Sequence, residues 1–251
     1  MLLKFAERYD QEIFLLQKEL EAALYSWWPE TEDKYNAVKE DFTFKMLPVF
    51  SLALDDYLCI DRAAALSLAN IVRIYYFGQY AHETVVDDDE FLKNEKDFQF
   101  AILLGDYIQG KVLRLLNEAG LDMLLKIFSD MIADLNEGLV EKYRGRGDYA
   151  EVLDKTKRPY YAALTLSAAI IARQSEERKT LFKDLGVYFG MAAELIAHGK
   201  LLEKADWCIF QCETIFAQIN ENSPYINSAL EQAVRGLRKS LDDLRTKAAT
   251  V

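Results

Sequence analysis

Apolar residues recur along most of the chain at steps of three and four, the spacing that places them on one face of an α-helix. In the first segment this pattern runs from Leu2 to Leu24 and stops at Trp28-Pro29. No stretch shows a convincing strand pattern, so we predict an all-α chain of about nine helices. The expected helices span residues 2–28, 46–58, 62–84, 98–117, 121–143, 149–172, 181–198, 201–219 and 223–247.

Residue types near the segment ends agree with this assignment. Asp61 is suited to an N-cap and Pro48 to the first turn of a helix. Pro159 falls inside the segment 149–172, where a proline removes a backbone hydrogen bond, so this helix is expected to be kinked. Because no repeat or Pro/Ser-rich linker divides the sequence, we predict a single large helical bundle over residues 1–251.

Composition and charge narrow the class of protein. The chain has 251 residues, of which 51% are apolar, and only 4 prolines and 11 glycines, too few for a turn-rich sandwich or barrel. Its 41 acidic and 30 basic residues give a net charge of −11, which argues against binding nucleic acid or an anionic membrane surface. No apolar run reaches the roughly 20 residues of a transmembrane helix. Three scattered cysteines and no signal-peptide pattern predict a cytoplasmic location.

The sequence lacks the motifs of several common enzyme classes. There is no Gly-rich phosphate loop and no Gly-x-Ser-x-Gly motif. Neither His82 nor His198 follows a glutamate by three residues, so a di-iron carboxylate bundle is excluded. Cys208 and Cys212 share a helix face, but no further ligand lies at a zinc-binding spacing, and small buried thiols are favoured over zinc ligands.

An acidic cluster follows the apolar segment 62–84. Its members are Glu83, Asp87, Asp88, Asp89 and Glu90. Crowded carboxylates repel one another, and the helix dipole disfavours them at a C-terminal end. A Mg²⁺ ion bound together with diphosphate oxygens would relieve this repulsion. A solvated acidic loop is the alternative interpretation.

Several short motifs resemble, in the same order, those of the trans-isoprenyl diphosphate synthases, also called polyprenyl synthetases. These are residues 44–48 (FKMLP), 61–66 (DRAAAL), 82–87 (HETVVD), 104–107 (LGDY), 149–156 (YAEVLDKT) and 185–194 (LGVYFGMAAE). The resemblance implies an isoprenoid-synthase-like helical fold. It also implies prenyltransferase chemistry, in which two Asp-Asp-x-x-Asp clusters hold Mg²⁺ on an allylic diphosphate.

The same resemblance supplies candidate site residues but no catalytic residue. It implies Mg²⁺ ligands in the acidic cluster from Glu83 to Glu90. The implied substrate-binding residues are Lys45, His82, Lys93, Lys155, Thr156 and Glu194. Lys155 and Thr156 correspond to the family's Lys-Thr pair, and Glu194 stands in place of its usual glutamine.

The sequence departs from the family pattern at both acidic motifs. The first motif keeps Glu83 and Asp87 but has Thr84 at an acidic position. At the second motif, all three aspartates are replaced, by Ala197, His198 and Leu201. Losing a whole Mg²⁺ site raises the barrier to diphosphate ionisation by several kcal/mol, so ordinary independent synthase activity is not expected.

Three hypotheses follow. The first is a degenerate, non-catalytic or weakly catalytic subunit of a heteromeric prenyl synthase in quinone side-chain biosynthesis. Such a subunit would resemble component I of heptaprenyl diphosphate synthase. The resemblance also implies that small residues near Gly78 leave room for a growing prenyl chain. The partner of such a subunit would be a catalytic subunit or a second copy. The second is an independent Mg²⁺-dependent prenyltransferase or terpene-synthase-like enzyme with one acidic motif. The third is an all-α interaction protein unrelated to isoprenoids.

Some of these residues also have purely structural interpretations. His82 could cap its helix, and Lys155-Thr156 could be an exposed first-turn pair on the kinked helix. Asp55 and Asp56 end an apolar segment and are expected to face water.

Overall fold

The computed structural model describes residues 4–24, 28–83, 95–221 and 228–249. Within these residues the secondary structure is entirely helical, which confirms the predicted all-α class. The α-helices are α1 (Asp10–Leu24), α2 (Trp28–Val38), α3 (Phe42–Leu58), α4 (Arg62–Glu83), α5 (Glu95–Glu118), α6 (Leu125–Tyr143), α7 (Tyr149–Thr156), α8 (Arg158–Ile171), α9 (Glu176–Ala197), α10 (Leu202–Asn220) and α11 (Ala229–Ala249), with short 3₁₀ segments η1 (Lys4–Tyr9) and η4 (Asp122–Leu124).

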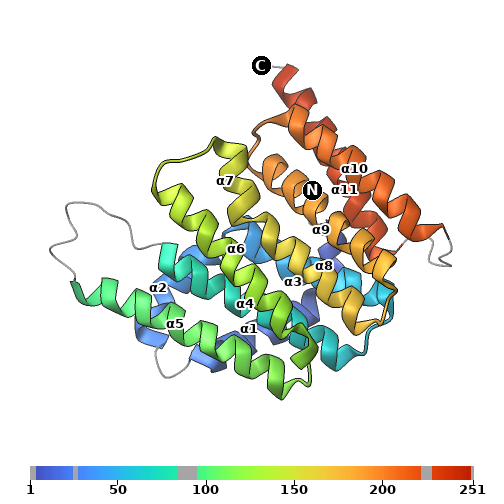
Figure 1. Cartoon of the computed structure of the whole chain (residues 1–251). Helices are drawn as coiled ribbons and strands as arrows, with labels where there is room; N and C mark the ends of the chain where they lie inside the picture. The colour runs from blue at the N-terminus through green and yellow to red at the C-terminus, as the bar shows by residue number, and fades with distance from the viewer. Residues whose placement is uncertain (1–3, 25–27, 84–94, 222–227, 250–251) are drawn as a thin grey trace.

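The helices form a bundle around α3, α4, α8 and α9 (Figure 1). Helix α8 packs along α9, and α3 packs along α4 and α8. Helix α10 covers α9, α5 lies against α4, and α11 contacts α3, α9 and α10. Buried apolar side chains from η1 to α11 form one continuous cluster. At its centre the rings of Phe50 and Phe189 stack with centroids 3.9 Å apart.

The start of α3 differs from the sequence prediction. The helix begins at Phe42, because the side chain of Asp41 accepts a hydrogen bond from the backbone N–H of Phe44 (3.0 Å) and so caps it. Pro48 was predicted to lie in the first turn, but it lies inside the helix. Helix α2 was not predicted, since its sequence is largely polar. A sparse row of buried side chains, Thr31, Tyr35 and Val38, packs it against the bundle.

The predicted kink in segment 149–172 is a break between two helices. Helix α7 ends at Thr156 and α8 begins at Arg158, with Pro159 in the first turn of α8. A proline is tolerated there because the first N–H groups of a helix have no intrahelical acceptor. A reciprocal capping box between Asp148 and Glu151 fixes the start of α7.

Two interpretations of individual side chains are settled by burial. Cys208 and Cys212 are buried in α10 as free thiols, as predicted, and burial raises the pKa of Cys208 to about 11. Asp55 was expected to face water, but it is 1% exposed. It lies on the same face of α3 as buried Ser51, whose hydroxyl donates to it at 3.3 Å, and burial raises the pKa of Asp55 well above its usual range.

None of the helices in the described part of the chain is both long enough and apolar enough to cross a membrane.

Candidate functional site

Polar side chains from four helices meet inside the bundle, in what we call the interior polar cluster. Its members are Asp41, Thr43, Tyr76, Lys157, Tyr161 and Glu194. The Tyr76 hydroxyl donates to Asp41 Oδ1 (2.8 Å) and accepts a hydrogen bond from Lys157 Nζ. The ammonium of Lys157 also lies 4.6 Å from the centroid of the Tyr76 ring. These contacts join the start of α3, the middle of α4 and the α7–α8 junction.

Glu194 forms the second half of the cluster. Its carboxylate is fully buried, and Oε1 accepts hydrogen bonds from Thr43 Oγ1 (2.8 Å) and Tyr161 Oη (2.7 Å). Oε2 is buried without a hydrogen-bond partner in the described structure, 3.8 Å from Nε2 of His198. Burial raises the pKa of Glu194, although the positive charge of Lys157 and the two hydrogen bonds act in the opposite direction.

Aromatic side chains fill the space around the interior polar cluster. Tyr160 packs against Tyr76 (centroids 5.1 Å apart) and Tyr75 (5.9 Å), and Tyr161 packs against Phe50 (6.1 Å). Burial raises the pKa of both Tyr160 and Tyr161 well above the usual value, so these hydroxyls stay protonated. The cluster therefore consists of hydrogen-bonded groups held in a largely aromatic interior.

The two described candidates at the end of α4 are engaged with other helices. Nε2 of His82 lies 2.9 Å from the carbonyl oxygen of Ile102, so the ring links α4 to α5 and does not cap its helix. Glu83 forms an ion pair with Lys142 of α6 (2.7 Å). The other candidates of this region, Asp87, Asp88, Asp89, Glu90 and Lys93, lie outside the described residues.

The remaining candidates also have intramolecular partners. Lys45 pairs with Glu40 (2.7 Å), and Lys155 pairs with Glu141. Thr156 is buried and donates to the backbone carbonyl of Val152 (2.7 Å). The pair Lys155-Thr156 occupies the last turn of α7, so its interpretation as a first-turn pair was wrong.

Of the candidates that the structure describes, Glu194 is the one whose hydrogen bonds join the interior polar cluster. Lys157 was missed because the motif comparison selected Lys155, two residues earlier. Tyr76 was missed as well, although it lies two turns before Glu83 on the same face of α4, a spacing that could have drawn attention to it.

The end of α9 does not fit a Mg²⁺ ion. Residues 195–201 contain no acidic side chain, and the pKa of Glu194 is raised, whereas Mg²⁺ prefers ionised oxygen ligands. Ala197 ends α9, His198 is its C-cap, and Leu201 precedes α10 with a left-handed backbone (φ 48°). In the described part of the chain, His, Cys, Asp and Glu side chains form no group of three or more positioned to bind a metal.

The space expected beside Gly78 is already filled. A Cβ atom at Gly78 would lie 2.6 Å from Cγ2 of Ile108, so this glycine allows α4 and α5 to approach closely. The family resemblance had implied room for a prenyl chain beside this glycine. The side chain of Ile108 occupies that room.

The helical arrangement is that of the isoprenyl diphosphate synthases. It superposes on a geranyltranstransferase from Methanosarcina mazei with a TM-score of 0.71 at 14% identity, covering 97% of this chain and 99% of that one. A polyprenyl synthase from Caulobacter crescentus, in complex with calcium and isoprenyl diphosphate, gives 0.65 at 15% identity over 100% and 88%.

A chain of the heterotetrameric geranyl pyrophosphate synthase of mint gives a TM-score of 0.66 at 13% identity, over 92% of this chain and 98% of that one. At identities this low the likeness establishes the fold. No protein-family model matches the sequence, and no curated protein matches it.

Proposed function

We propose that this protein is a non-catalytic or weakly catalytic subunit of a heteromeric trans-prenyl diphosphate synthase in isoprenoid biosynthesis, for example of quinone side chains. Its fold relates it to the prenyl synthases, and a heteromeric synthase of mint contains a chain of similar fold. The subunit would stabilise the catalytic partner and help to set product length.

One observation carries the proposal: the interior of this bundle is closed by its own side chains at the end of α9. Glu194 is enclosed by Thr43 and Tyr161, and after it α9 continues without an acidic residue to Ala197 and the C-cap His198. Within residues 194–201, Glu194 is the one acidic side chain that a metal ion on a diphosphate bound there could use. The ammonium of Lys157, which could contact such an anion, already donates to Tyr76.

The outer face of α5 supports the assembly part of the proposal. Large apolar side chains are exposed there, at Ile102 (39%), Leu103 (65%), Tyr107 (39%) and Leu113 (43%). The opposite face of α5 packs on α4. Exposed apolar side chains concentrated on one helix are typical of a protein interface. We propose that the catalytic synthase subunit docks on this face.

An assay of prenyl elongation tests the proposal. The purified chain is incubated with Mg²⁺, isopentenyl diphosphate and allylic diphosphates, alone and with a candidate polyprenyl synthase from the same source. We expect product only in the presence of the synthase, together with co-elution of the two chains. The double variant Glu83→Ala/Asp87→Ala should leave this product unchanged.

The other two hypotheses give different results in the same assay. Product from the chain alone that is lost in Glu83→Ala/Asp87→Ala would overturn the subunit proposal and establish an independent Mg²⁺-dependent prenyltransferase with one acidic motif. Absence of product and of co-elution with the synthase would also overturn it, in favour of an interaction protein unrelated to isoprenoids.

A further inference from the structure

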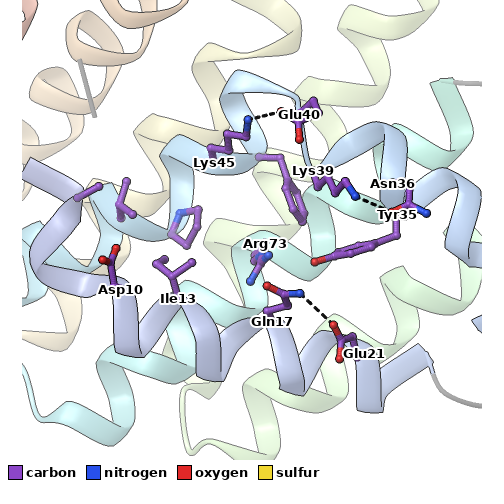
Figure 2. A pocket seen from close by; sticks show the side chains of 14 residues that line it. Asp10, Ile13, Gln17, Glu21, Tyr35, Asn36, Lys39, Glu40, Lys45 and Arg73 are labelled. Atoms are coloured by element: carbon purple, nitrogen blue, oxygen red, sulfur yellow. Dashed lines mark hydrogen bonds and ion pairs between the residues drawn. The ribbon is translucent and has the colours of Figure 1, made fainter. Parts of the chain in front are cut away.

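A cavity of about 560 Å³ lies between α1, α2, α3 and α4, apart from the interior polar cluster. Figure 2 shows Arg73 of α4 near the centre of the lining, beside Gln17 of α1 and Tyr35 of α2. The volume is within the range of cavities that bind small molecules.

Arg73 is a buried cation with unused hydrogen-bond donors. Its residue exposure is 5%, and neither Nε nor Nη1 has a hydrogen-bond partner in the described structure. The guanidinium carbon lies 4.7 Å from the centroid of the Phe44 ring, a cation–π contact that satisfies no N–H donor. Burying such donors without acceptors is unfavourable, so the site is suited to a ligand that supplies them.

In the described structure, no carboxylate accepts a hydrogen bond from Nε or Nη1 of Arg73. Glu21 attracts the guanidinium, but its carboxylate is bonded to Lys18 (2.7 Å) and Gln17 (3.0 Å). At the rim, Lys45 pairs with Glu40 at 2.7 Å and Lys39 donates to Asn36 at 2.8 Å (Figure 2). Asp10 adds a negative charge at the start of α1. The lining therefore carries three basic and three acidic side chains, and Arg73 is the buried cation among them.

Apolar side chains form another part of the lining. They are Ala6, Ile13, Phe44, Pro48 and Val49. A ligand that satisfies both parts of the cavity has an anionic group and a short apolar body.

We propose that this cavity binds a small organic anion, whose carboxylate or phosphate oxygens accept hydrogen bonds from Nε and Nη1 of Arg73. The planar guanidinium is suited to two parallel hydrogen bonds with such a group. Phe44 separates the site from the interior polar cluster, since its ring contacts Arg73 and packs 6.3 Å from the ring of Tyr76. The site is thus independent of the proposed subunit role.

Calorimetric titration with butanoate, butyl phosphate and n-butanol tests the proposal and distinguishes the two anionic groups. We expect at least one anion to bind the wild-type chain, and n-butanol to bind at least about tenfold more weakly. In Arg73→Met the anion affinity should fall by about tenfold or more, whereas Lys126→Met, which removes an exposed cation of α6, should leave it unchanged.

A second measurement keeps the proposal testable if Arg73→Met does not fold. In the wild-type chain, the nuclear magnetic resonance signal of the Arg73 Nε–H should shift with the bound anion and not with n-butanol. Failure of both anions to bind better than n-butanol, equal anion binding by Arg73→Met, or an Nε–H signal unaffected by the bound anion would each overturn the proposal.

Discussion

The Tyr161 hydroxyl and the Glu194 carboxylate form a buried hydrogen bond of 2.7 Å between Oη and Oε1, which ties α8 to α9. Burial raises the pKa of Glu194 above its unfolded-state value, so the folded chain binds more protons than the unfolded one in the intervening pH range. The contribution of Glu194 to the free energy of unfolding is therefore most favourable in acid and is lost as pH rises through the folded-state pKa.

The variant Glu194→Gln should remove this pH dependence, because its side-chain oxygen still accepts hydrogen bonds but the group does not ionise. As pH rises, the free energy of unfolding should fall less steeply in the variant than in the wild-type chain, by up to about 1.4 kcal/mol per pH unit. Urea unfolding between about pH 5 and 8 measures this slope. Glu137→Gln, at an exposed position of α6, is the control, and slopes equal in all three chains would contradict the expectation.

Lys157, and not Lys155, should be the lysine on which the interior polar cluster depends. Lys157→Met loses the hydrogen bond to Tyr76 and the contact with its ring, and we expect a loss of about 1–2 kcal/mol in unfolding free energy. Lys155→Met removes a partly exposed ion pair with Glu141 and should change stability less. Chemical denaturation of both variants decides the order, and the reverse order would refute this assignment.

Gly186 should be intolerant of any side chain. A Cβ atom there would lie 2.3 Å from Thr165 Oγ1 and 2.4 Å from the carbonyl oxygen of Tyr161, so Gly186→Ala must push α8 and α9 apart. We expect a loss of about 2–3 kcal/mol. Gly110→Ala is the matched control, since its Cβ would meet nothing within 4 Å on exposed α5, and should stabilise by about 0.5–1 kcal/mol. Similar effects of both substitutions on thermal unfolding would contradict the close packing described here.

The exposed face of α5 should determine association with the catalytic partner. Leu103→Glu/Leu113→Glu places two charges on this face, and we expect binding to the synthase subunit to weaken by about tenfold or more. Phe210→Glu, at an exposed apolar position of α10, should bind normally. Analytical ultracentrifugation with the purified partner measures the difference. Loss of binding in the α10 variant alone would place the interface elsewhere.

The fold was predictable from the sequence where apolar residues are dense and regular. The expected helix 62–84 is α4, Arg62–Glu83, because buried side chains follow one another along nearly its whole length. Helix α2 could not be predicted this way, since Thr31, Tyr35 and Val38 are a weak pattern in a polar segment. Its position depends on packing against α1 and α4, which sequence periodicity does not report.

The candidate site was less predictable, because the partners of charged residues are set by packing between distant segments. Glu83 and Lys142 are 59 positions apart and pair across two helices. Asp55 was assigned to water on the basis of its charge, although it lies one turn after Ser51 on a buried face of α3. Glu194 was selected from its motif, but its enclosure by Tyr161 and Thr43 is visible only in three dimensions.

Asp41 connects the backbone at the start of α3 with the interior polar cluster through a single oxygen atom. Oδ1 accepts both the N–H of Phe44 and the hydroxyl of Tyr76. Fraying of the first turn of α3 and release of Tyr76 are therefore coupled motions. We therefore expect the hydrogen-exchange rate of the Phe44 amide to report the release of Tyr76 from Asp41 inside the bundle, with no ligand added.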